Sequence, residues 1–450
     1  MNFSKYLKEC NQVYHTTLDP KTPGVVRIHL VPPQKPKPHI PWVAIINGYS
    51  VLPLQSAWAI LLKEFIEELN KTEGKTALSD EDINEIVENT IDNVKTVFDK
   101  TSRTVIKDDL KDLVTTLKDL ARGKEPTSEI GYMTLAKYSK YMQAPHRMDL
   151  MVSAMEKDGC WNCNCKCLHC YAAGEEKSNV SELSTDEWKK AIDALRKACI
   201  PAITFTGGEA TIRDDLVELI DYSKWFVTRL NTNGILLSKE LCERLYNASL
   251  DSVQVTLYSS NPEIHNTLVG GNHFDQTVQG IKNAIEAGLD VSINTPLCSL
   301  NSDYIDTMKF ASKLGVTYFS TSGLIPTGNA NKSDSIITQL SKEEITKIIK
   351  EAAKYAKEEH LEISFTSPGW ISDDVLKKLN IVTPSCGACM SNMAIAPNGD
   401  VIPCQSWLNG KTLGNILHDN WKIIWNSKET KAIRKLACEK TEVCLLKEEN

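Results

Sequence analysis

The pattern of apolar and polar positions predicts regular elements from the start of the chain. Apolar residues alternate with polar ones over residues 26–30, which is the period of a half-buried strand. Two further apolar runs, 43–46 and 49–52, flank Asn47-Gly48, a pair that favours a two-residue hairpin turn because both residues tolerate positive φ angles. Three apolar stripes with helical spacing follow, over about residues 55–69, 79–98 and 108–122.

Strands and helices alternate regularly over residues 148–330. Six apolar runs predict strands, and helical stripes fill the gaps between them. The runs cover residues 148–153, 202–206, 226–231, 252–258, 290–295 and 316–320. Repeated strand-helix units of this length predict a parallel sheet, and right-handed crossovers curl such a sheet into an open or partial barrel. We therefore expect ligands at the carboxyl ends of the strands.

The last part of the chain, residues 331–450, has a different character. A charged helix is expected over about 342–359, and a segment rich in turn residues and cysteine follows over 384–446. The whole pattern predicts an α/β protein: a partial (β/α)6 barrel, preceded by a winged-helix-like α+β module and followed by a small C-terminal module. The predicted boundaries are 1–110 for the first module, 111–147 for a helical linker, 148–330 for the barrel and 331–450 for the last module.

Composition and charge exclude several classes of protein. The chain has 450 residues and a formal net charge of −7, so it lacks the basic field of a non-specific nucleic-acid binder. It begins without an apolar signal-peptide core, and no apolar run approaches the roughly 18 residues of a membrane span. Of 14 cysteines, five lie between 160 and 170 and five between 386 and 444. We expect a cytoplasmic protein with reduced thiols that binds metal, and neither nucleic acid nor a membrane as partner.

Three closely spaced cysteines, Cys163, Cys167 and Cys170, follow the first predicted strand of the barrel. Thiolates hold iron–sulfur clusters, and three ligands on one loop leave one iron of a [4Fe-4S] cluster open to another molecule. A zinc knuckle and a redox pair are the alternatives. Zinc needs a fourth nearby ligand, and His169 is poorly placed for that role because it is wedged between ligands.

This cysteine motif, followed by Tyr171, resembles the signature of the radical S-adenosylmethionine (SAM) superfamily. The family's GGE motif is matched by Gly207-Gly208-Glu209 at the end of the second predicted strand. Two glycines let the backbone approach a ligand closely, and a carboxylate is a natural partner for an ammonium group. The resemblance extends over about 180 residues, and it implies that this motif binds the methionine amino group of SAM.

Further residues occupy positions where contacts to SAM recur in the family. They are His169, Tyr171, Asn233, Gln254, Thr256, Tyr258 and Asn294. The turn Pro326-Thr327-Gly328, after the sixth strand, occupies another such position. Taken alone, each of these residues is also consistent with a turn or capping role.

The resemblance implies a particular chemistry. In the family, the open iron binds SAM, and one-electron reduction yields a 5′-deoxyadenosyl radical that abstracts a hydrogen atom from the substrate. An external reductant of flavodoxin or ferredoxin type is therefore implied as a partner. The protein itself mainly orients the substrate and excludes water and oxygen, so no catalytic residue is assigned beyond the cluster. Cys160 and Cys165 match no ligand position and are either bystanders or redox-active thiols.

A second group of cysteines resembles the SPASM or twitch extension of radical SAM enzymes. Its members are Cys386, Cys389, Cys404, Cys438 and Cys444. Pro397-Asn398-Gly399 predicts a hairpin turn that brings Cys404 back beside the earlier pair. The pattern has fewer cysteines than a full SPASM domain, so we expect one auxiliary [4Fe-4S] cluster, held by the first three cysteines and one or both of the later two. A second auxiliary cluster, and a structural zinc in place of the cluster, stay open.

The N-terminal module resembles the PqqD-like element that binds the leader of a ribosomally made, modified peptide by adding it to a sheet as an extra strand. A generic winged-helix-like or purely structural module is the alternative. The resemblance implies that the substrate is a precursor peptide, recognised through its leader.

We therefore expect a radical SAM maturase that cross-links a ribosomally synthesised precursor peptide. A thioether between a cysteine sulfur and an α-carbon, as in a sactipeptide, is the leading product, and a carbon–carbon or ether link is close behind. Peptide epimerisation is a second enzymatic hypothesis. A non-catalytic iron–sulfur electron carrier is a hypothesis of a different class.

Overall fold

The structure is a computed structural model that describes most of the chain. The described residues are 3–18, 26–48, 50–72, 75, 77–121, 135–332, 337–410, 412–440 and 443–447. They belong to two compact units, Met1–His146 with Arg196–Pro201 and Arg147–Leu195 with Ala202–Asn450. Tyr49 of the predicted hairpin and residues 122–134 of the predicted linker lie outside the described residues.

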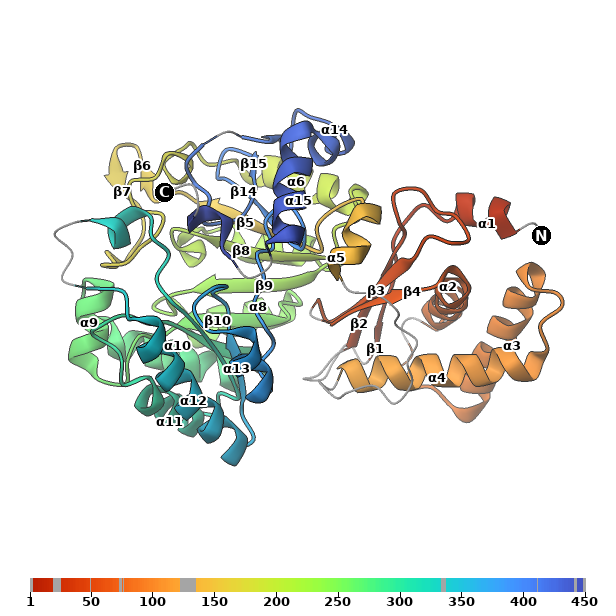
Figure 1. The fold of residues 1–450 in the computed structure, drawn as a ribbon, viewed down its shortest axis with the longest axis horizontal. Coiled ribbons are helices and arrows are strands. Elements are labelled where there is room, and N and C mark those ends of the chain that lie inside the picture. The colour runs from red at the N-terminus through yellow and green to blue at the C-terminus, as the bar shows by residue number, and fades with distance from the viewer. Residues whose placement is uncertain are drawn as a thin grey trace. The chain divides into compact units, whose positions relative to one another are not determined.

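The first unit contains a four-stranded antiparallel sheet and the helices that pack against it (Figure 1). Its strands, in spatial order, are β1 (Tyr14–Leu18), β2 (Val26–Val31), β3 (Trp42–Ile46) and β4 (Ser50–Leu54). Its helices are α1 (Phe3–Glu9), α2 (Ser56–Asn70), α3 (Asp80–Val97), α4 (Arg103–Ala121) and α5 (Leu135–Tyr138), followed by the 3-10 turn η1 (Ser139–Tyr141). One hydrophobic core joins the sheet to α2, α3 and α4. The sequence pattern predicted these elements apart from α1, β1, α5 and η1.

The predicted hairpin is present, but its turn is longer than two residues. The register pairs Ile46 with Ser50, which leaves three residues between the strands. Asn47 extends the pairing toward β2, because its backbone N–H donates to the Arg27 carbonyl and its side chain accepts from the Arg27 N–H, both at 2.8 Å. Asn47 and Gly48 do adopt the expected positive φ angles, 51° and 66°.

The second unit is built on a ten-stranded sheet in which most neighbours are parallel (Figure 1). All six strands predicted for the barrel are present, and consecutive ones are neighbours. They are β5 (Arg147–Ser153), β8 (Ala202–Gly207), β9 (Val227–Thr232), β10 (Ser252–Thr256), β11 (Asp290–Pro296) and β12 (Tyr318–Ser322). The prediction of an α/β fold with a large parallel sheet is therefore confirmed.

The C-terminal part of the chain extends this sheet at both edges. β13 (Glu362–Phe365) pairs with β12, and β14 (Asn392–Ile395) pairs in parallel with β5. β15 (Asp400–Ile402) and β16 (Gly414–Asn415) continue the sheet beyond β14. β5, the strand that leads into the cysteine loop, thus lies between β8 and β14. A separate two-stranded hairpin, β6 (Glu156–Lys157) and β7 (Cys160–Trp161), follows β5.

Helices lie between the strands of the second unit, and the last two follow the final strand. They are α6 (Thr185–Lys197), α7 (Leu216–Tyr222), α8 (Lys239–Asn247), α9 (Pro262–Val269), α10 (Phe274–Glu286), α11 (Tyr304–Lys313), α12 (Lys342–Glu358), α13 (Asp373–Lys378), α14 (Trp421–Asn426) and α15 (Lys428–Glu439). Short 3-10 turns add η2 (Glu176–Ser178), η3 (Ala210–Ile212), η4 (Gly328–Asn331) and η5 (Leu445–Lys447).

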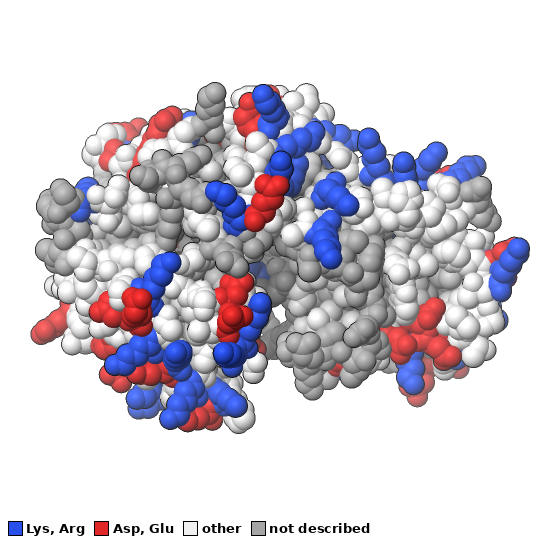
Figure 2. Space-filling model, in the orientation of Figure 1, with Lys and Arg blue, Asp and Glu red and all other residues white. Residues whose placement is uncertain are grey.

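Surface charge is mixed in sign. Figure 2 shows Lys and Arg side chains interspersed with Asp and Glu over α11 and α12, as the sequence KEEITKIIKEAAKYAKE of α12 implies. Within the residues searched, the structure has no helix whose length and apolar character would let it cross a membrane.

The N-terminus of α3 gives a test of the first unit. Ser79 accepts a hydrogen bond from the Asp82 N–H at 3.1 Å, and Asp82 accepts one from the Ser79 N–H at 2.9 Å, which is a complete capping box. We expect Ser79→Ala to lower the free energy of unfolding by about 1 kcal/mol, because N–H groups of the first turn lose their acceptor. Chemical denaturation of Ser79→Ala and Ser79→Thr measures this. Equal stability of the alanine and threonine variants would contradict it.

Candidate functional site

The loop that carries Cys163, Cys167 and Cys170, called the cysteine loop, follows β7. On one side it is held by the end of α9. The Lys166 N–H donates to the Val269 carbonyl at 2.9 Å, and the Leu168 N–H donates to the Leu268 carbonyl at 3.0 Å. Gly270 ends α9 with a φ of 70°, and a Cβ at this position would lie 2.6 Å from the Lys166 carbonyl oxygen. Only glycine therefore allows the helix end to pack this closely against the loop.

On its other side, the loop is held by the turn that follows β12. The Asn329 N–H donates to the Cys170 carbonyl at 2.9 Å, and Asn329 Nδ2 donates to the Cys167 carbonyl at 2.9 Å. The Gly328 N–H donates to Glu175 Oε1 at 2.7 Å. The predicted turn at Pro326 thus touches the cysteine loop, through Thr327, whose Oγ1 donates to the Tyr171 carbonyl at 3.1 Å, and through Asn329, which the sequence analysis did not single out.

The three thiols of the loop have an electrostatic environment that suits metal binding. Burial raises the pKa of Cys163 to about 12 and that of Cys170 to about 11, and a neighbouring thiolate raises each of them further. The pKa of Cys167 is also raised, first by a hydrogen bond with Cys165 and then by burial. Lone thiolates are therefore disfavoured here, whereas a bound metal deprotonates its thiol ligands outright. This donor set fits an iron–sulfur cluster, although no three His, Cys, Asp or Glu side chains of the described chain are arranged to hold a single metal ion.

The two glycines of the GGE turn are explained by their packing against the end of β5. A Cβ at Gly207, whose φ is 141°, would clash with the backbone of Ser153, and one at Gly208 would lie 2.9 Å from the Ala154 carbonyl oxygen. The turn is fixed by hydrogen bonds from the Gly208 N–H to the Ser153 carbonyl at 2.9 Å and from the Glu209 N–H to Ser153 Oγ at 3.1 Å. Within the chain, the close neighbours of the two glycines are therefore Ser153 at the end of β5 and Ala154 directly after it.

The Glu209 carboxylate is buried where β8 and β9 end. Its Oε1 accepts hydrogen bonds from the Thr211 N–H at 3.0 Å, from Thr211 Oγ1 at 2.6 Å and from Thr232 Oγ1 at 2.7 Å. Its Oε2 accepts from the Asn233 N–H at 2.8 Å. Four donors hold the carboxylate in one position.

Asn233 connects this carboxylate to the cysteine loop. Besides its backbone bond to Glu209, Asn233 donates from Nδ2 to Asn164 Oδ1 at 2.6 Å. The Nδ2 of Asn164 is buried and has no hydrogen-bond partner among the described residues. Asn164 was missed by the sequence analysis because it appears only as a spacer between two cysteines, and its amide is a donor available to a bound molecule.

The polar residues predicted on the middle strands lie next to one another in the sheet. Gln254 on β10 is paired with Asn231 on β9, and Thr256 on β10 is paired with Asn294 on β11. All four side chains are partly exposed, whereas their neighbours along each strand are buried. They therefore share one face of the sheet, as the period of a strand requires.

His169 and Tyr258 form a buried pair behind the cysteine loop. His169 Nε2 lies 2.8 Å from the Tyr258 hydroxyl, and the Tyr258 N–H donates to His265 Nδ1 at 3.3 Å. Burial lowers the pKa of His169 to about 4, so the ring is neutral near pH 7. Tyr171 packs on the other side of the loop, among Met151, Ala394 and their neighbours. His169 and Tyr258 contact each other, and Tyr171 lies in a separate cluster.

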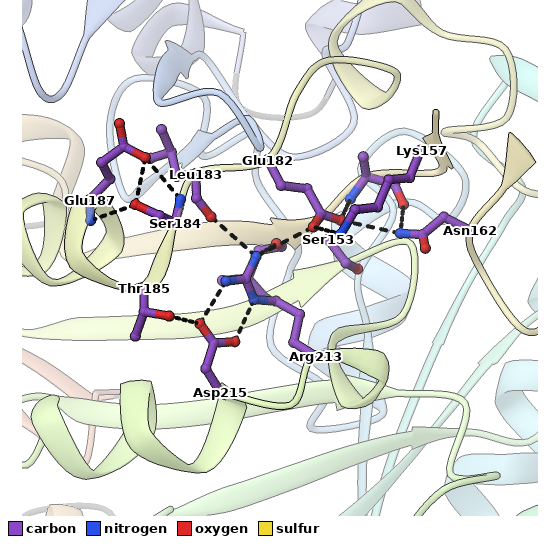
Figure 3. Close-up of polar contacts among 12 residues, drawn as sticks. Ser153, Lys157, Asn162, Glu182, Leu183, Ser184, Thr185, Glu187, Arg213 and Asp215 are labelled. Carbon is purple, nitrogen blue, oxygen red and sulfur yellow. Dashed lines mark hydrogen bonds and ion pairs between the residues drawn. The ribbon is translucent and has the colours of Figure 1, made fainter. Parts of the chain in front are cut away.

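A partly buried ionic network of Arg213, Asp215 and Glu182 lies at the end of β5, the strand against which the GGE turn packs (Figure 3). Arg213, four residues after Glu209, makes two hydrogen bonds with Asp215, at 2.8 and 2.7 Å. Its Nη1 also donates to the Val152 carbonyl at 2.9 Å and to the Leu183 carbonyl at 3.3 Å. Planar bidentate pairing fixes the orientation of the guanidinium, and thereby the end of β5 relative to the turn.

Glu182 carries this network to the start of the cysteine loop (Figure 3). It lies 3.5 Å from Arg213 Nη1, and its Oε1 accepts from the Ala154 N–H at 3.0 Å and from Asn162 Nδ2 at 3.2 Å. Asn162 directly precedes Cys163. One set of side chains therefore contacts both the end of β5, on which the GGE turn packs, and the residue before the first cysteine, and none of them was predicted as a site residue.

Four of the C-terminal cysteines are close enough to influence one another. Cys386 and Cys404 raise the pKa of Cys389, and Cys444 and Cys386 raise that of Cys404, although burial is the larger cause in both cases. The pKa of Cys404 reaches about 12. The hairpin of β14 and β15 brings Cys404 to this place, with Gly399 at a φ of 88° in its turn. Four thiols of this kind fit a metal cluster for the same reason as the first three.

Cys438, the remaining C-terminal cysteine, contacts a methionine. Its Sγ is 3.3 Å from Met390 Sδ. The structure therefore places Cys444 beside Cys404, and Cys438 against the thioether of Met390.

A cavity of about 1210 Å³ opens at the carboxyl ends of β12 and β13. It is lined by residues that follow these strands, by the start of α12 and α13, and by the C-terminal segment; among them are Leu324, Gln339, Lys342, Trp370, Ile371 and Cys444. Its lining combines apolar, aromatic and charged side chains, as is common in ligand sites.

Two family models match the chain. The radical SAM superfamily matches residues 162–311, and the SPASM iron-sulfur cluster-binding domain matches residues 386–445. An AdoMet-dependent heme synthase of Methanosarcina barkeri is 28% identical over 290 residues, which are 59% of this chain and 80% of that protein. The mycofactocin maturase MftC of Mycolicibacterium smegmatis is 29% identical over 273 residues, which are 59% of this chain and 68% of that protein.

The fold resembles that of a solved peptide-bound enzyme over most of its length. The crystal structure of Streptococcus suis SuiB bound to precursor peptide SuiA matches with a TM-score of 0.61 and 14% sequence identity, covering 90% of this chain and 92% of that one. Together with the two domains, this relationship implies a [4Fe-4S] cluster, SAM and auxiliary iron–sulfur clusters as cofactors. The chain contains a radical SAM domain and a SPASM domain, and it is an enzyme whose relatives include a peptide maturase and heme synthases.

Proposed function

We propose that this enzyme cross-links a ribosomally synthesised precursor peptide, with a thioether between a cysteine sulfur and an α-carbon as the leading product. The observation that carries the proposal is the similarity in fold to SuiB, an enzyme solved with its precursor peptide, over 90% of the chain. A match over 90% of the chain is longer than the second unit, so it includes part of the first unit. The alignment to the heme synthase covers only 59% of the chain.

The first unit is the proposed leader-binding module. Its sheet ends in two edge strands, β1 and β4. An edge strand offers unpaired N–H and C=O groups to which an extended peptide can add. β4 contains Pro53, which has no N–H to donate, whereas no residue of β1 is proline.

In the second unit, the proposed cluster ligands are Cys163, Cys167 and Cys170. Glu209 supplies the negative charge for the amino group of SAM, and Asn164 supplies an unused amide donor. Bound cluster and SAM would supply the abstraction of a hydrogen atom from the peptide, with electrons from an external flavodoxin or ferredoxin. The chain itself fixes the two motifs relative to each other, through Asn233.

The proposed auxiliary cluster is held by cysteines of the C-terminal segment, Cys386, Cys389 and Cys404, with one or both of Cys438 and Cys444. The position of Cys444 next to Cys404 supports its assignment as the fourth ligand. Cys444 also lines the cavity at the ends of β12 and β13. We therefore assign this cavity to the part of the peptide that is modified, because it adjoins both the strand ends and the auxiliary thiols.

A tetrapyrrole substrate is a second candidate. It is favoured by the 28% identity to the heme synthase, of which this chain covers 80%. Modification of the precursor peptide in the assay below decides between the two substrates.

The first prediction concerns the cluster thiols. We expect Cys163→Ser to lose the iron of the SAM-binding cluster and to lower SAM cleavage more than about 100-fold, because a metal ligand is removed. Cys160→Ser is the matched control, since Cys160 is exposed and lies on the same segment. Iron content and 5′-deoxyadenosine formation are measured for both. Equal loss in the two variants would show that the ligand assignment is wrong.

The second prediction concerns the product. Reduced enzyme, SAM and the peptide encoded by a neighbouring short reading frame should give a product lighter by two hydrogen atoms per cross-link, measured by mass spectrometry. Treatment of the peptide thiols with an alkylating reagent should then label one cysteine fewer, which separates a thioether from a carbon–carbon link. Unchanged mass with deuterium uptake from heavy water would indicate epimerisation. Unmodified peptide with continued SAM cleavage would refute a peptide substrate.

The third prediction concerns the cavity. We expect Trp370→Ala to raise the KM for the peptide about tenfold, because truncating an aromatic contact costs about 1–2 kcal/mol of binding. SAM cleavage without peptide should be unchanged. Val382→Ala, whose side chain is 85% exposed, is the control. A KM for Trp370→Ala equal to that of the control would show that the peptide does not bind in this cavity.

A further inference from the structure

Arg434 occupies an unusual position beside the C-terminal cysteines. It lies on α15, and its guanidinium carbon is 3.8 Å from the centre of the Trp425 ring. Its Nη2 donates to the Trp425 carbonyl at 3.1 Å, and its Nη1 lies 3.5 Å from the Cys389 carbonyl oxygen. Stacking on an aromatic ring and a backbone bond hold the planar group in one orientation.

The charge of Arg434 has no carboxylate partner in the described part of the chain. The ion pairs found there include none to this side chain, although it is partly buried. The ionisable groups that interact with it are the thiols of Cys389 and Cys438, which would carry negative charge only as thiolates. The other basic residues of α15 differ, because Lys428, Lys431 and Lys435 are all exposed, and Lys435 lies 3.7 Å from Glu439.

The partly buried charge of Arg434 should affect any cluster bound by the neighbouring cysteines. A partly buried cation is costly unless a negative charge lies nearby, and neutral thiols do not supply one. A cluster ligated by thiolates carries net negative charge, and it becomes more negative on reduction. The reduction potential of such a cluster depends on nearby charge, on hydrogen bonds to sulfur and on solvent exposure. A fixed cation beside it therefore favours the reduced form.

We propose that Arg434 is the counter-charge of the auxiliary iron–sulfur cluster and raises its reduction potential. Arg434 places a positive charge beside the cluster and does not bind the iron itself. The inference goes beyond the proposed function, since it rests on the iron–sulfur content of the SPASM domain and not on the identity of the peptide. Through this charge, the enzyme would set how readily the auxiliary cluster takes up an electron.

The test is a redox titration of the auxiliary cluster, followed by electron paramagnetic resonance and without peptide. The full chain is used in a background in which Cys163, Cys167 and Cys170 are replaced by alanine, so that only auxiliary iron is seen. We expect Arg434→Gln to raise the ratio of oxidised to reduced cluster about tenfold at a fixed potential, which equals about 59 mV for one electron. Lys431→Gln, which removes an exposed charge from the same helix, should change the ratio much less.

Arg434→Lys keeps the charge, so its titration should stay closer to that of the parent than to that of Arg434→Gln. If Arg434→Gln does not retain iron, Arg434→Lys decides, since retention of iron at the parent potential supports the proposal and loss of iron contradicts it. Coincident titrations of Arg434→Gln and Lys431→Gln, or zinc in place of iron at the C-terminal cysteines, would overturn it. None of these results depends on whether a peptide is modified.

Discussion

The site depends on one constraint, which is that three partly buried thiols on a single loop must be held where a metal cluster can bind them. Burial raises the pKa of Cys163 to about 12. Free thiolates are therefore unfavourable in this loop. The protein instead fixes the backbone of the loop, between the end of α9 and the turn after β12. The Glu182 side chain also contacts Asn162, which directly precedes the first of these thiols.

The second motif is tied to the first by direct contacts. Ser153, at the end of β5, binds the GGE turn, and Glu182 connects Arg213 to the residue before Cys163. Asn233 links Glu209 to the cysteine loop, because its N–H donates to Glu209 and its side chain donates to Asn164. A carboxylate and a cluster that must act on one small molecule need fixed separation, and preorganised contacts of this kind provide it.

The sequence could predict what depends on local pattern, and it could not predict what depends on long-range pairing. Cysteine spacing, the GGE turn and six alternating strands are local, and the structure contains the turn and the strands. The pairing of β14 with β5 joins residues more than 200 positions apart through a short strand, so no local period indicates it. Asn164, Asn329 and Glu182 are polar residues in loops, and their partners become visible only once the loops are folded together.

The central claim is that the bound cofactors remove a hydrogen atom from an α-carbon of a precursor peptide. The most direct measurement uses a precursor that carries deuterium at the α-carbon of the residue to be linked, and follows the label by mass spectrometry. The account predicts that deuterium appears in 5′-deoxyadenosine together with the cross-linked peptide. Cross-linked peptide accompanied by unlabelled 5′-deoxyadenosine would contradict it.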